Sequence, residues 1–299
     1  MHILKINKIF ILVLFIILSC SLLAQPGEQP SGSGTENDPY LVGTLNNLYW
    51  MTENSGEWDK YYVQTSDIDA SSTDTWDEGL GFTSIGNNSI KFTGSYDGGG
   101  YTINGLTINR PTTAYIGLFG YTLGSTIKDL GVVNVNITGG SRTAGLVGHN
   151  KFSSVSNCYI TGSIIGVEFV GGLVGMVDDS STVNNCYSTS DVNGSGNVVG
   201  GLVGKNISSS VSNCYSTGSV TGTDFVGGLV GIVDDSSTVS NCYSTSDVNG
   251  SGNIVGGLVG KNISSSVSHC YSTGSVTGTN FVGGIIGFGS GGYAVSSLF

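Results

Sequence analysis

Five cysteines divide the second half of the chain into equal intervals. They are Cys158, Cys186, Cys214, Cys242 and Cys270, and each is 28 residues from the next. The motif Gly-Gly-Leu-Val-Gly recurs on the same scale, beginning at Gly171, Gly200, Gly227 and Gly256, with variants that begin at Ile116, Ala144 and Gly283. The segments 171–226 and 227–282 also match each other at all but five of 56 positions. A chain with this internal repeat is expected to fold as a stack of similar units.

The repeating unit predicts the fold class. A unit of about 28 residues is too small to fold alone, so it must bury its apolar residues against neighbouring copies. It holds short β-branched runs bounded by Gly, Asn, Ser and Asp, and no long stretch with helical periodicity. Glycine, at 49 of 299 residues, further disfavours helices. We therefore expect an all-β fold: a parallel, right-handed β-solenoid (β-helix) with coils of about 28 residues that rise ~4.8 Å each.

Residues around each cysteine alternate as they would in a strand. Counting from Cys214, the even positions carry Ser, Gly and Val, which suit a crowded interior. Val211 has the wrong parity for that side, but a left-handed bend at Asn213 would turn both Val211 and Cys214 inward. The same corner position is filled in turn by Asn157, Asn185, Asn213, Asn241 and His269. We expect the cysteines to form an inner structural column of free thiols, because five stacked cysteines cannot all pair and their side chains point the same way.

Charge and motif content argue against several functions. Lys and Arg number 10 against 21 Asp and Glu, a formal net charge of −11, so nucleic acid is not an expected partner. The histidines His2, His149 and His269 lack the H-E-x-x-H spacing of a zinc peptidase, and His149, which follows Gly148, is expected in a turn. No glycine-rich motif leads into a helix as a phosphate-binding loop would. We expect no catalytic residues, no metal and no cofactor.

Acidic pairs keep an enzymatic alternative open. A β-solenoid can carry sugar-cleaving carboxylates, and two carboxylates can act as acid and base. The pairs here stand in Asp-Asp-Ser-Ser stretches of turn composition that recur after 56 residues, whereas an active site usually occurs once. We interpret them as solvated turns, with weak calcium binding as the alternative. The residues concerned are Asp178, Asp179, Asp234 and Asp235.

The motif and the segment after it resemble a known repeat. A Gly-(Gly/Ala)-Leu-Val-Gly motif followed by Ser-Asn-Cys-Tyr-Ser-Thr-Gly-Ser-Val is similar to the GLUG repeat of bacterial surface proteins, over about residues 112–288. The stretches 32–41, 62–69 and 92–103 resemble the first coils of secreted β-helices. Such repeats accompany filamentous-haemagglutinin-like adhesins and some IgA-cleaving metallopeptidases. The resemblance implies surface display and binding. Peptidase activity is not carried over, because the zinc motif is missing.

The chain divides into four segments. Residues 1–24 have the basic start, apolar run and small final residue of a secretory signal peptide, and we favour cleavage over lipidation at Cys20. Residues 25–111 are expected to form an N-terminal cap and the first coils, with a short helix at 45–53 after Thr44. Residues 112–288 hold the repeats, and 289–299 read as an incomplete strand, as in a truncated chain. No membrane span is expected in the mature chain.

Outward-facing columns are the best candidate for binding. Each repeat cysteine is followed by a tyrosine and, two positions later, by a threonine. The next position of the same parity alternates between serine and aspartate. Stacked tyrosines with neighbouring hydroxyls and carboxylates could bind a ligand, or could only stabilise the sheet. The candidate columns are Tyr159, Tyr187, Tyr215, Tyr243 and Tyr271; Thr161, Thr189, Thr217, Thr245 and Thr273; and Asp191 and Asp247.

These features together predict a non-catalytic protein that is secreted or displayed on the bacterial surface. We expect an adhesin-like binding or structural module for an extracellular glycan or for a surface protein of a host or neighbouring cell. Two alternatives stay open. One is a β-helix lyase or glycosidase that acts on polysaccharide, and the other is a passive stalk or spacer of a larger surface protein.

Overall fold

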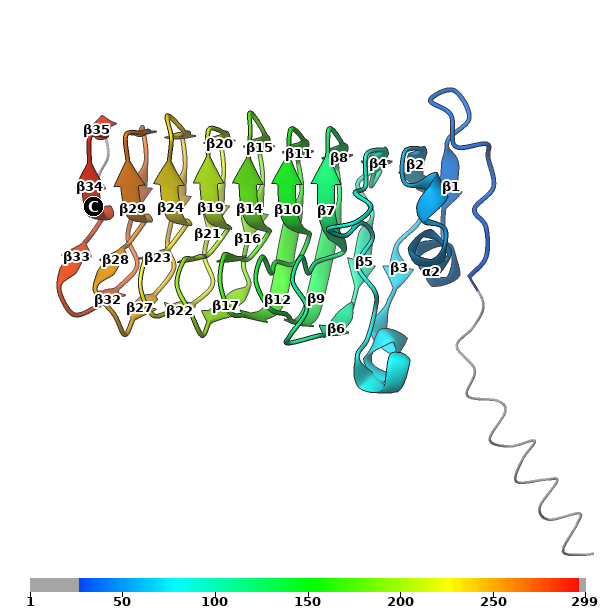
Figure 1. Cartoon of the computed structure of the whole chain (residues 1–299), viewed down its shortest axis with the longest axis horizontal. Coiled ribbons are helices and arrows are strands. Elements are labelled where there is room, and N and C mark those ends of the chain that lie inside the picture. The colour runs from blue at the N-terminus through cyan, green and yellow to red at the C-terminus, as the bar shows by residue number, and fades with distance from the viewer. Residues whose placement is uncertain (1–26, 296–299) are drawn as a thin grey trace, which may run out of the picture.

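The computed structural model describes residues 27–295, which form an elongated solenoid (Figure 1). The expected signal peptide at 1–24, Cys20 within it and residues 296–299 lie outside the described residues. Parallel strand pairing continues along the rod from β1 (Tyr40–Val42) to β35 (Tyr293–Val295). The prediction of an all-β, parallel β-solenoid with coils of about 28 residues is confirmed.

Four sheets run along the rod, and a repeat coil visits them in a fixed order. The chain passes from the seven-stranded to the ten-stranded sheet, then to the thirteen-stranded and the five-stranded sheet. The seven-stranded sheet contains β7 (Phe119–Leu123), β10 (Val147–Lys151), β14 (Val174–Asp178), β19 (Val203–Ile207), β24 (Val230–Asp234), β29 (Val259–Ile263) and β34 (Ile286–Ser290). The five-stranded sheet contains β13 (Val170–Gly171), β18 (Val199–Gly200), β23 (Val226–Gly227), β28 (Ile254–Gly256) and β33 (Phe281–Gly283).

The other two sheets carry the outward columns named above. Besides β1 and β35, the ten-stranded sheet contains β2 (Tyr61–Gln64), β4 (Ser95–Asp97), β8 (Thr126–Lys128), β11 (Ser154–Ser156), β15 (Thr182–Asn184), β20 (Ser210–Ser212), β25 (Thr238–Ser240) and β30 (Ser266–Ser268). The thirteen-stranded sheet contains β3 (Ile68–Asp69), β5 (Thr102–Asn104), β6 (Thr107–Asn109), β9 (Gly131–Thr138), β12 (Tyr159–Gly166), β16 (Tyr187–Ser188), β17 (Asp191–Gly194), β21 (Tyr215–Ser216), β22 (Val220–Gly222), β26 (Tyr243–Ser244), β27 (Val248–Gly250), β31 (Tyr271–Ser272) and β32 (Val276–Thr277).

A short helix closes the N-terminal end. Helix α2 (Leu45–Glu53) has the bounds that the sequence indicates, and Figure 1 places it beside β1 and β2. The Thr44 hydroxyl accepts a hydrogen bond from the Asn47 N–H at 3.2 Å, and the Asn47 side chain accepts one from the Thr44 N–H at 3.1 Å, which together cap the helix start. Leu48 and Met51 are fully buried, so the helix covers the first coil. Three short 3₁₀ turns follow: η2 (Ser55–Glu57), η3 (Ser71–Thr75) and η4 (Asp77–Gly79).

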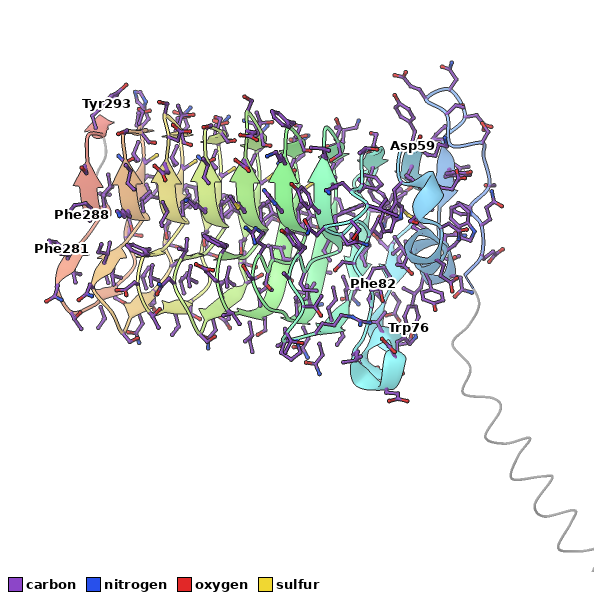
Figure 2. All side chains as sticks on the ribbon, in the orientation of Figure 1. Asp59, Trp76, Phe82, Phe281, Phe288 and Tyr293 are labelled. Atoms are coloured by element: carbon purple, nitrogen blue, oxygen red, sulfur yellow. The ribbon has the colours of Figure 1, made fainter. Side chains whose placement is uncertain are left out.

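The two ends of the described rod both carry aromatic pairs (Figure 2). Near the cap, the rings of Trp76 and Phe82 lie 6.4 Å apart. At the other end, Phe281 and Phe288 lie 5.4 Å apart with an edge-to-face geometry. Phe82 is fully buried whereas Phe281 is 51% exposed, so the N-terminal end is the more completely covered of the two.

The corner before each cysteine has the predicted left-handed backbone. The five corner residues have φ between 52° and 54°, a conformation that asparagine tolerates better than most residues. Val211 and Cys214 are both buried as a result, and the Asn185 side-chain amide donates to Asn157 Oδ1 at 3.3 Å. The corner residues are Asn157, Asn185, Asn213, Asn241 and His269.

The strand after the cysteine is shorter than its alternation suggests. In most repeat coils it splits into two pieces, such as β16 and β17, and only the first repeat coil has the continuous strand β12. Local hydrogen bonding explains the break in two coils: the Ser188 hydroxyl accepts the Ser190 N–H at 3.3 Å, and Ser244 does the same for Ser246 at 3.2 Å. A backbone N–H taken up by a nearby hydroxyl is lost to the strand ladder.

The glycines of the repeat motif are required by space. A β-carbon on the second glycine, such as Gly201, would overlap the carbonyl of Gly228 in the next coil and the hydroxyl of Ser216. One on the last glycine, such as Gly204, would overlap the carbonyl of Gly175 and the backbone of Phe169. Both positions are glycine in every copy of the motif, whereas the first position is Ile116 or Ala144 in the two earliest copies. The Leu and Val between the glycines are fully buried in the four perfect copies and form the core (Leu173, Val174, Leu202, Val203, Leu229, Val230, Leu258 and Val259).

Candidate binding face

Five tyrosines form a stacked ladder on the thirteen-stranded sheet. Their ring centroids are 4.8, 4.8, 4.8 and 4.9 Å apart, and successive ring planes differ by 7°, 3°, 4° and 4°. This spacing matches the distance of about 4.8 Å between neighbouring strands, so each ring lies directly over the one before it. We call Tyr159, Tyr187, Tyr215, Tyr243 and Tyr271 the tyrosine ladder.

The ladder has one covered and one open end. A β-carbon on Gly131 in the preceding coil would overlap the Tyr159 ring, so that ring lies over the Gly131 backbone. Tyr271 at the other end is 41% exposed. Between them the ring faces are covered by neighbouring rings, and the structure presents ring edges and phenol hydroxyls to solvent.

The threonine and aspartate columns run beside the ladder, on the face where the sequence places them. Thr189, Thr217, Thr245 and Thr273 are exposed, whereas Thr161 is half-buried and its hydroxyl accepts the Asn134 N–H at 2.8 Å. The tyrosine, threonine and aspartate columns therefore form one surface with a polar group in every coil.

The two aspartates of this face are held by the coil that follows. Asp191 Oδ1 accepts hydrogen bonds from the Ser219 N–H at 3.1 Å and from its hydroxyl at 2.5 Å. Asp247 makes the same pair of bonds to Ser275, at 3.1 and 2.6 Å. The Ser275 hydroxyl, with its N–H, lowers the pKa of the Asp247 carboxyl. Each carboxylate has a second oxygen that can accept a hydrogen bond from a ligand.

The phenols of the ladder are donors at neutral pH. Partial burial, and after it the neighbouring phenols, raise the pKa of Tyr187 and of Tyr243. The face thus combines phenol and threonine hydroxyls with carboxylate acceptors, which is the set of groups that recognises a hydroxyl-rich ligand.

The acidic pairs lie in turns and have lysine partners. Asp179 and Asp235 have left-handed φ values of 49° and 55°, in keeping with the predicted turns. Lys151 Nζ lies 2.6 Å from Asp179 Oδ2 and 3.7 Å from Asp178 Oδ2. Lys205 Nζ lies 3.6 Å from Asp234 Oδ2. An ammonium group from the preceding coil therefore occupies the place beside each pair that a cation would take.

The five repeat cysteines are free and buried. They line one inner column, where they are 0–2% exposed. Each sulfur lies 3.0–3.1 Å from the carbonyl oxygen two residues earlier, to which the thiol donates. Burial raises the pKa of Cys186 and of Cys214, which keeps these thiols protonated.

A buried polar cluster on the seven-stranded sheet was not predicted. His149 was expected in a turn, but it lies within β10 and is 6% exposed. Its ring stacks on Tyr121 at 4.4 Å, Tyr115 stacks on Tyr121 at 5.3 Å, and the Arg142 guanidinium lies 5.1 Å from the Tyr115 centroid. The turn prediction failed because the two rings and the guanidinium converge on a strand position that follows a glycine.

The electrostatics of His149 follow from this burial. Burial lowers the pKa of His149 to about 4, Arg142 acts in the same direction, and Asp178 opposes both. His149 Nε2 lies 3.4 Å from Asp178 Oδ2, but neither ring nitrogen makes a hydrogen bond. The imidazole is therefore neutral at pH 7. A signal was present in the sequence: Tyr121, His149 and Met176 occupy equivalent places in successive copies of the motif.

Two searches of the described residues frame the site. Across residues 27–295 no group of three or more His, Cys, Asp or Glu side chains is placed to hold a metal ion. Within the same range, none of the helices has the length and apolar character needed to cross a membrane.

A family model for the GLUG motif matches four segments of the chain. The matched residues are 139–165, 195–221, 226–249 and 251–277. They lie within the region where the sequence resembles GLUG repeats, and each contains strands of the solenoid.

Two relatives share the repeat region. Halomucin of Haloquadratum walsbyi is 36% identical over 160 residues, which are 50% of this chain and 2% of halomucin. A protein of Evansella cellulosilytica named as a Gly-rich membrane protein is 36% identical over 138 residues, 44% of this chain and 15% of that protein. The chain therefore corresponds to a small part of each of these relatives.

Two solved structures share the fold. A candidate immunoglobulin A1 protease from Bacteroides ovatus aligns with a TM-score of 0.68 and 22% identity, over 85% of this chain and 86% of that one. A structure named IgA1 Protease aligns with a TM-score of 0.62 and 19% identity, over 86% of this chain and 21% of the other. At these identities the likeness establishes the architecture alone. The chain is thus a β-solenoid protein with GLUG motif repeats.

Proposed function

We propose that this chain is a non-catalytic, adhesin-like module that binds an extracellular glycan through the tyrosine ladder and the columns beside it. The observation that carries the proposal is the in-register face of tyrosine, threonine and aspartate, which offers the same polar groups in successive coils. An extended polymer with repeating hydroxyl groups can contact several coils at once, and such multiple contacts raise its affinity.

The orientation of the ladder rings favours a glycan over an apolar protein surface. Ring faces are covered by neighbouring rings at 4.8 Å, so the ladder offers little apolar area. Phenol hydroxyls, threonine hydroxyls and the free carboxylate oxygens of Asp191 and Asp247 offer hydrogen bonds instead. A host or neighbouring-cell protein as the partner is an outcome that the binding test can reveal.

The non-catalytic part of the proposal rests on the acidic pairs. Asp178 and Asp179 lie in an outer turn beside Lys151, and Asp234 lies beside Lys205. A glycosidase instead needs two carboxylates facing each other across a bound sugar. The name protease belongs to the structural neighbours, and the fold likeness gives no reason to extend it to this chain.

Display outside the cell completes the proposal. It is supported by the signal-type segment 1–24 and by a relative named as a membrane protein. Antibody labelling of intact cells that express the full chain tests it. Labelling should equal that of permeabilised cells, and labelling that requires permeabilisation would contradict display.

A glycan array with three proteins tests the binding face. The first variant changes all five ladder tyrosines to phenylalanine, which keeps the stacked rings and removes the hydroxyls. A control variant changes Ser154, Thr182, Ser210, Thr238 and Ser266 to alanine, one outward position per coil on the neighbouring ten-stranded sheet. We expect the control to keep the binding profile of the original chain and the phenylalanine variant to lose at least about tenfold in signal.

Two outcomes would overturn the proposal. Identical glycan and cell-binding profiles for all three folded proteins would make the ladder purely structural and the chain a spacer. Release of reducing sugar from a bound polysaccharide, abolished by Asp→Asn at positions 178, 179, 234 and 235, would establish the enzymatic alternative.

A further inference from the structure

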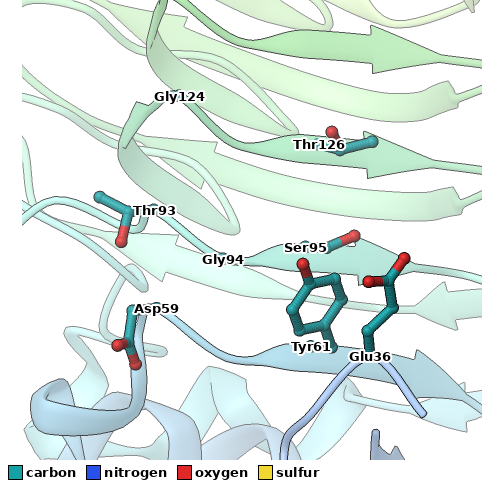
Figure 3. Close-up of a pocket in the computed structure, with 8 residues that line it drawn as sticks. All are labelled: Glu36, Asp59, Tyr61, Thr93, Gly94, Ser95, Gly124 and Thr126. Atoms are coloured by element: carbon teal, nitrogen blue, oxygen red, sulfur yellow. The ribbon is translucent and has the colours of Figure 1, made fainter.

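A hollow lies on the outer side of the ten-stranded sheet, next to the N-terminal cap (Figure 3). Its volume is about 320 Å³, at the small end of the range for ligand pockets. Three successive strands and the segment before β1 contribute to its wall. The lining side chains used below are Glu36, Asp59, Tyr61, Thr93, Ser95 and Thr126.

Tyr61 differs from the ladder tyrosines in one decisive respect. It points outward from β2 and is 40% exposed, and among residues 27–295 no other aromatic ring stacks on it. Its neighbours on the sheet in the direction of the rod are Ser95 and then Thr126, so small side chains stand where the ladder would place further rings. A face of the Tyr61 ring is therefore available to a ligand, which the inner rings of the tyrosine ladder do not offer.

Polar groups surround this ring. In Figure 3 the Glu36 carboxylate lies beside Tyr61 and Ser95, and Asp59 and Thr93 lie at the other end of the hollow. Asp59 is paired with Lys60 at 3.2 Å, whereas no side chain of the described residues pairs with the Glu36 carboxylate. One carboxylate and three hydroxyls are thus free to make hydrogen bonds around an exposed aromatic face.

We propose that this hollow binds a single sugar residue that carries no acidic group. The C–H face of a pyranose ring is apolar and packs on an aromatic ring, while its edge hydroxyls need acceptors and donors. Tyr61 supplies the platform, Glu36 the acceptor, and Thr93, Ser95 and Thr126 the mixed donors and acceptors. Two carboxylates and one lysine leave the hollow acidic, so a uronic acid is rejected by like charge. The site is separate from the tyrosine ladder and does not depend on the proposed function of that face.

Ligand-observed NMR by saturation transfer, with millimolar sugars, tests the site on the chain without its signal segment. The probes are methyl β-glucopyranoside, N-acetylglucosamine and glucuronic acid. We expect transfer to at least one of the first two probes and none to glucuronic acid. Tyr61→Ala should reduce the transfer about tenfold, and Glu36→Gln should reduce it several-fold.

The matched control is Tyr101→Ala, which removes a tyrosine of similar exposure, 39%, outside the hollow. It should bind as the original chain does. Transfer that survives Tyr61→Ala, equal losses in the two tyrosine variants, or no transfer from the neutral probes would each overturn the proposal. The five-phenylalanine ladder variant should keep full transfer, so failure here and failure of the ladder proposal are distinguishable.

Discussion

The backbone N–H of Cys186 donates to the sulfur of Cys214 in the next coil, at 3.4 Å. The same bond recurs from Cys158 to Cys186 and from Cys214 to Cys242. Each of these sulfurs also donates its own proton to the carbonyl two residues earlier, so it is both acceptor and donor within the wall of the solenoid. The thiols are therefore hydrogen-bonded as thiols, and none is placed as half of a disulfide.

We expect these thiols to resist alkylation in the folded protein. Burial raises the pKa of Cys186, and the thiolate is the reactive form, so both access and ionisation oppose reaction. Iodoacetamide at pH 8 should leave the native chain unlabelled over hours and should label all five repeat cysteines in guanidinium. Mass spectrometry counts the labels. Rapid labelling of the native chain, or a mass two units low for each pair, would contradict the column of free thiols.

The motif glycines predict a graded response to alanine. Gly201→Ala places a β-carbon on the Gly228 carbonyl and the Ser216 hydroxyl, and because the carbonyl belongs to a paired coil it cannot move freely. We expect a loss of about 3 kcal/mol or more in the free energy of unfolding, or failure to fold. Gly289→Ala is the control, since its β-carbon meets nothing within 4 Å. It should change stability by less than about 0.5 kcal/mol. Similar losses for the two variants would show that chain flexibility, not space, governs these positions.

The tyrosine ladder predicts position-dependent stability. Tyr215 has a ring on either side at 4.8 Å, whereas Tyr271 has one neighbour at 4.9 Å. With about 0.5–1.5 kcal/mol for each aromatic pair, Tyr215→Leu should cost about twice as much as Tyr271→Leu. Urea denaturation followed by circular dichroism gives both values. A double-mutant cycle between Tyr187 and Tyr215 should give a coupling of about 1 kcal/mol, and a coupling near zero would exclude the rings as a source of stability.

Local pattern was enough to predict the repeated wall of the solenoid. The positions of Cys214, Val211 and Asn213 follow from alternation and from one residue type that accepts a left-handed bend, so neighbouring residues determine them. The ladder was predicted as a column for the same reason. Its ring orientation was not, because parity tells which side a tyrosine faces and says nothing about which part of the ring neighbouring coils cover.

Features that depend on several coils could not be predicted in the same way. The pairing of Lys151 with Asp178 and Asp179 depends on the 27-residue register of the seven-stranded sheet, which differs from the constant 28 of the cysteine column. The Tyr61 hollow needs Glu36, which a chain reversal between Thr35 and Asp38 brings to the sheet. Turns of this kind leave little trace in periodicity.

The buried imidazole of His149 predicts a specific pH dependence of stability. Its pKa is about 4 in the folded chain against 6.5 as the ordinary value, so between these pH values the unfolded chain binds more protons. Stability should therefore rise with pH from about 4 to 6.5 and level off above, by at most about 3 kcal/mol from this residue. His149→Phe keeps an aromatic ring against Tyr121 and cannot titrate, so its stability should rise less steeply over the same interval. His269→Asn is the control, because it changes a histidine at an exposed corner where the other four coils carry asparagine. Denaturation midpoints at half-unit steps from pH 4 to 7 check the slopes, and parallel curves for His149→Phe and the original chain would mean that the imidazole is hydrated or paired in the folded protein.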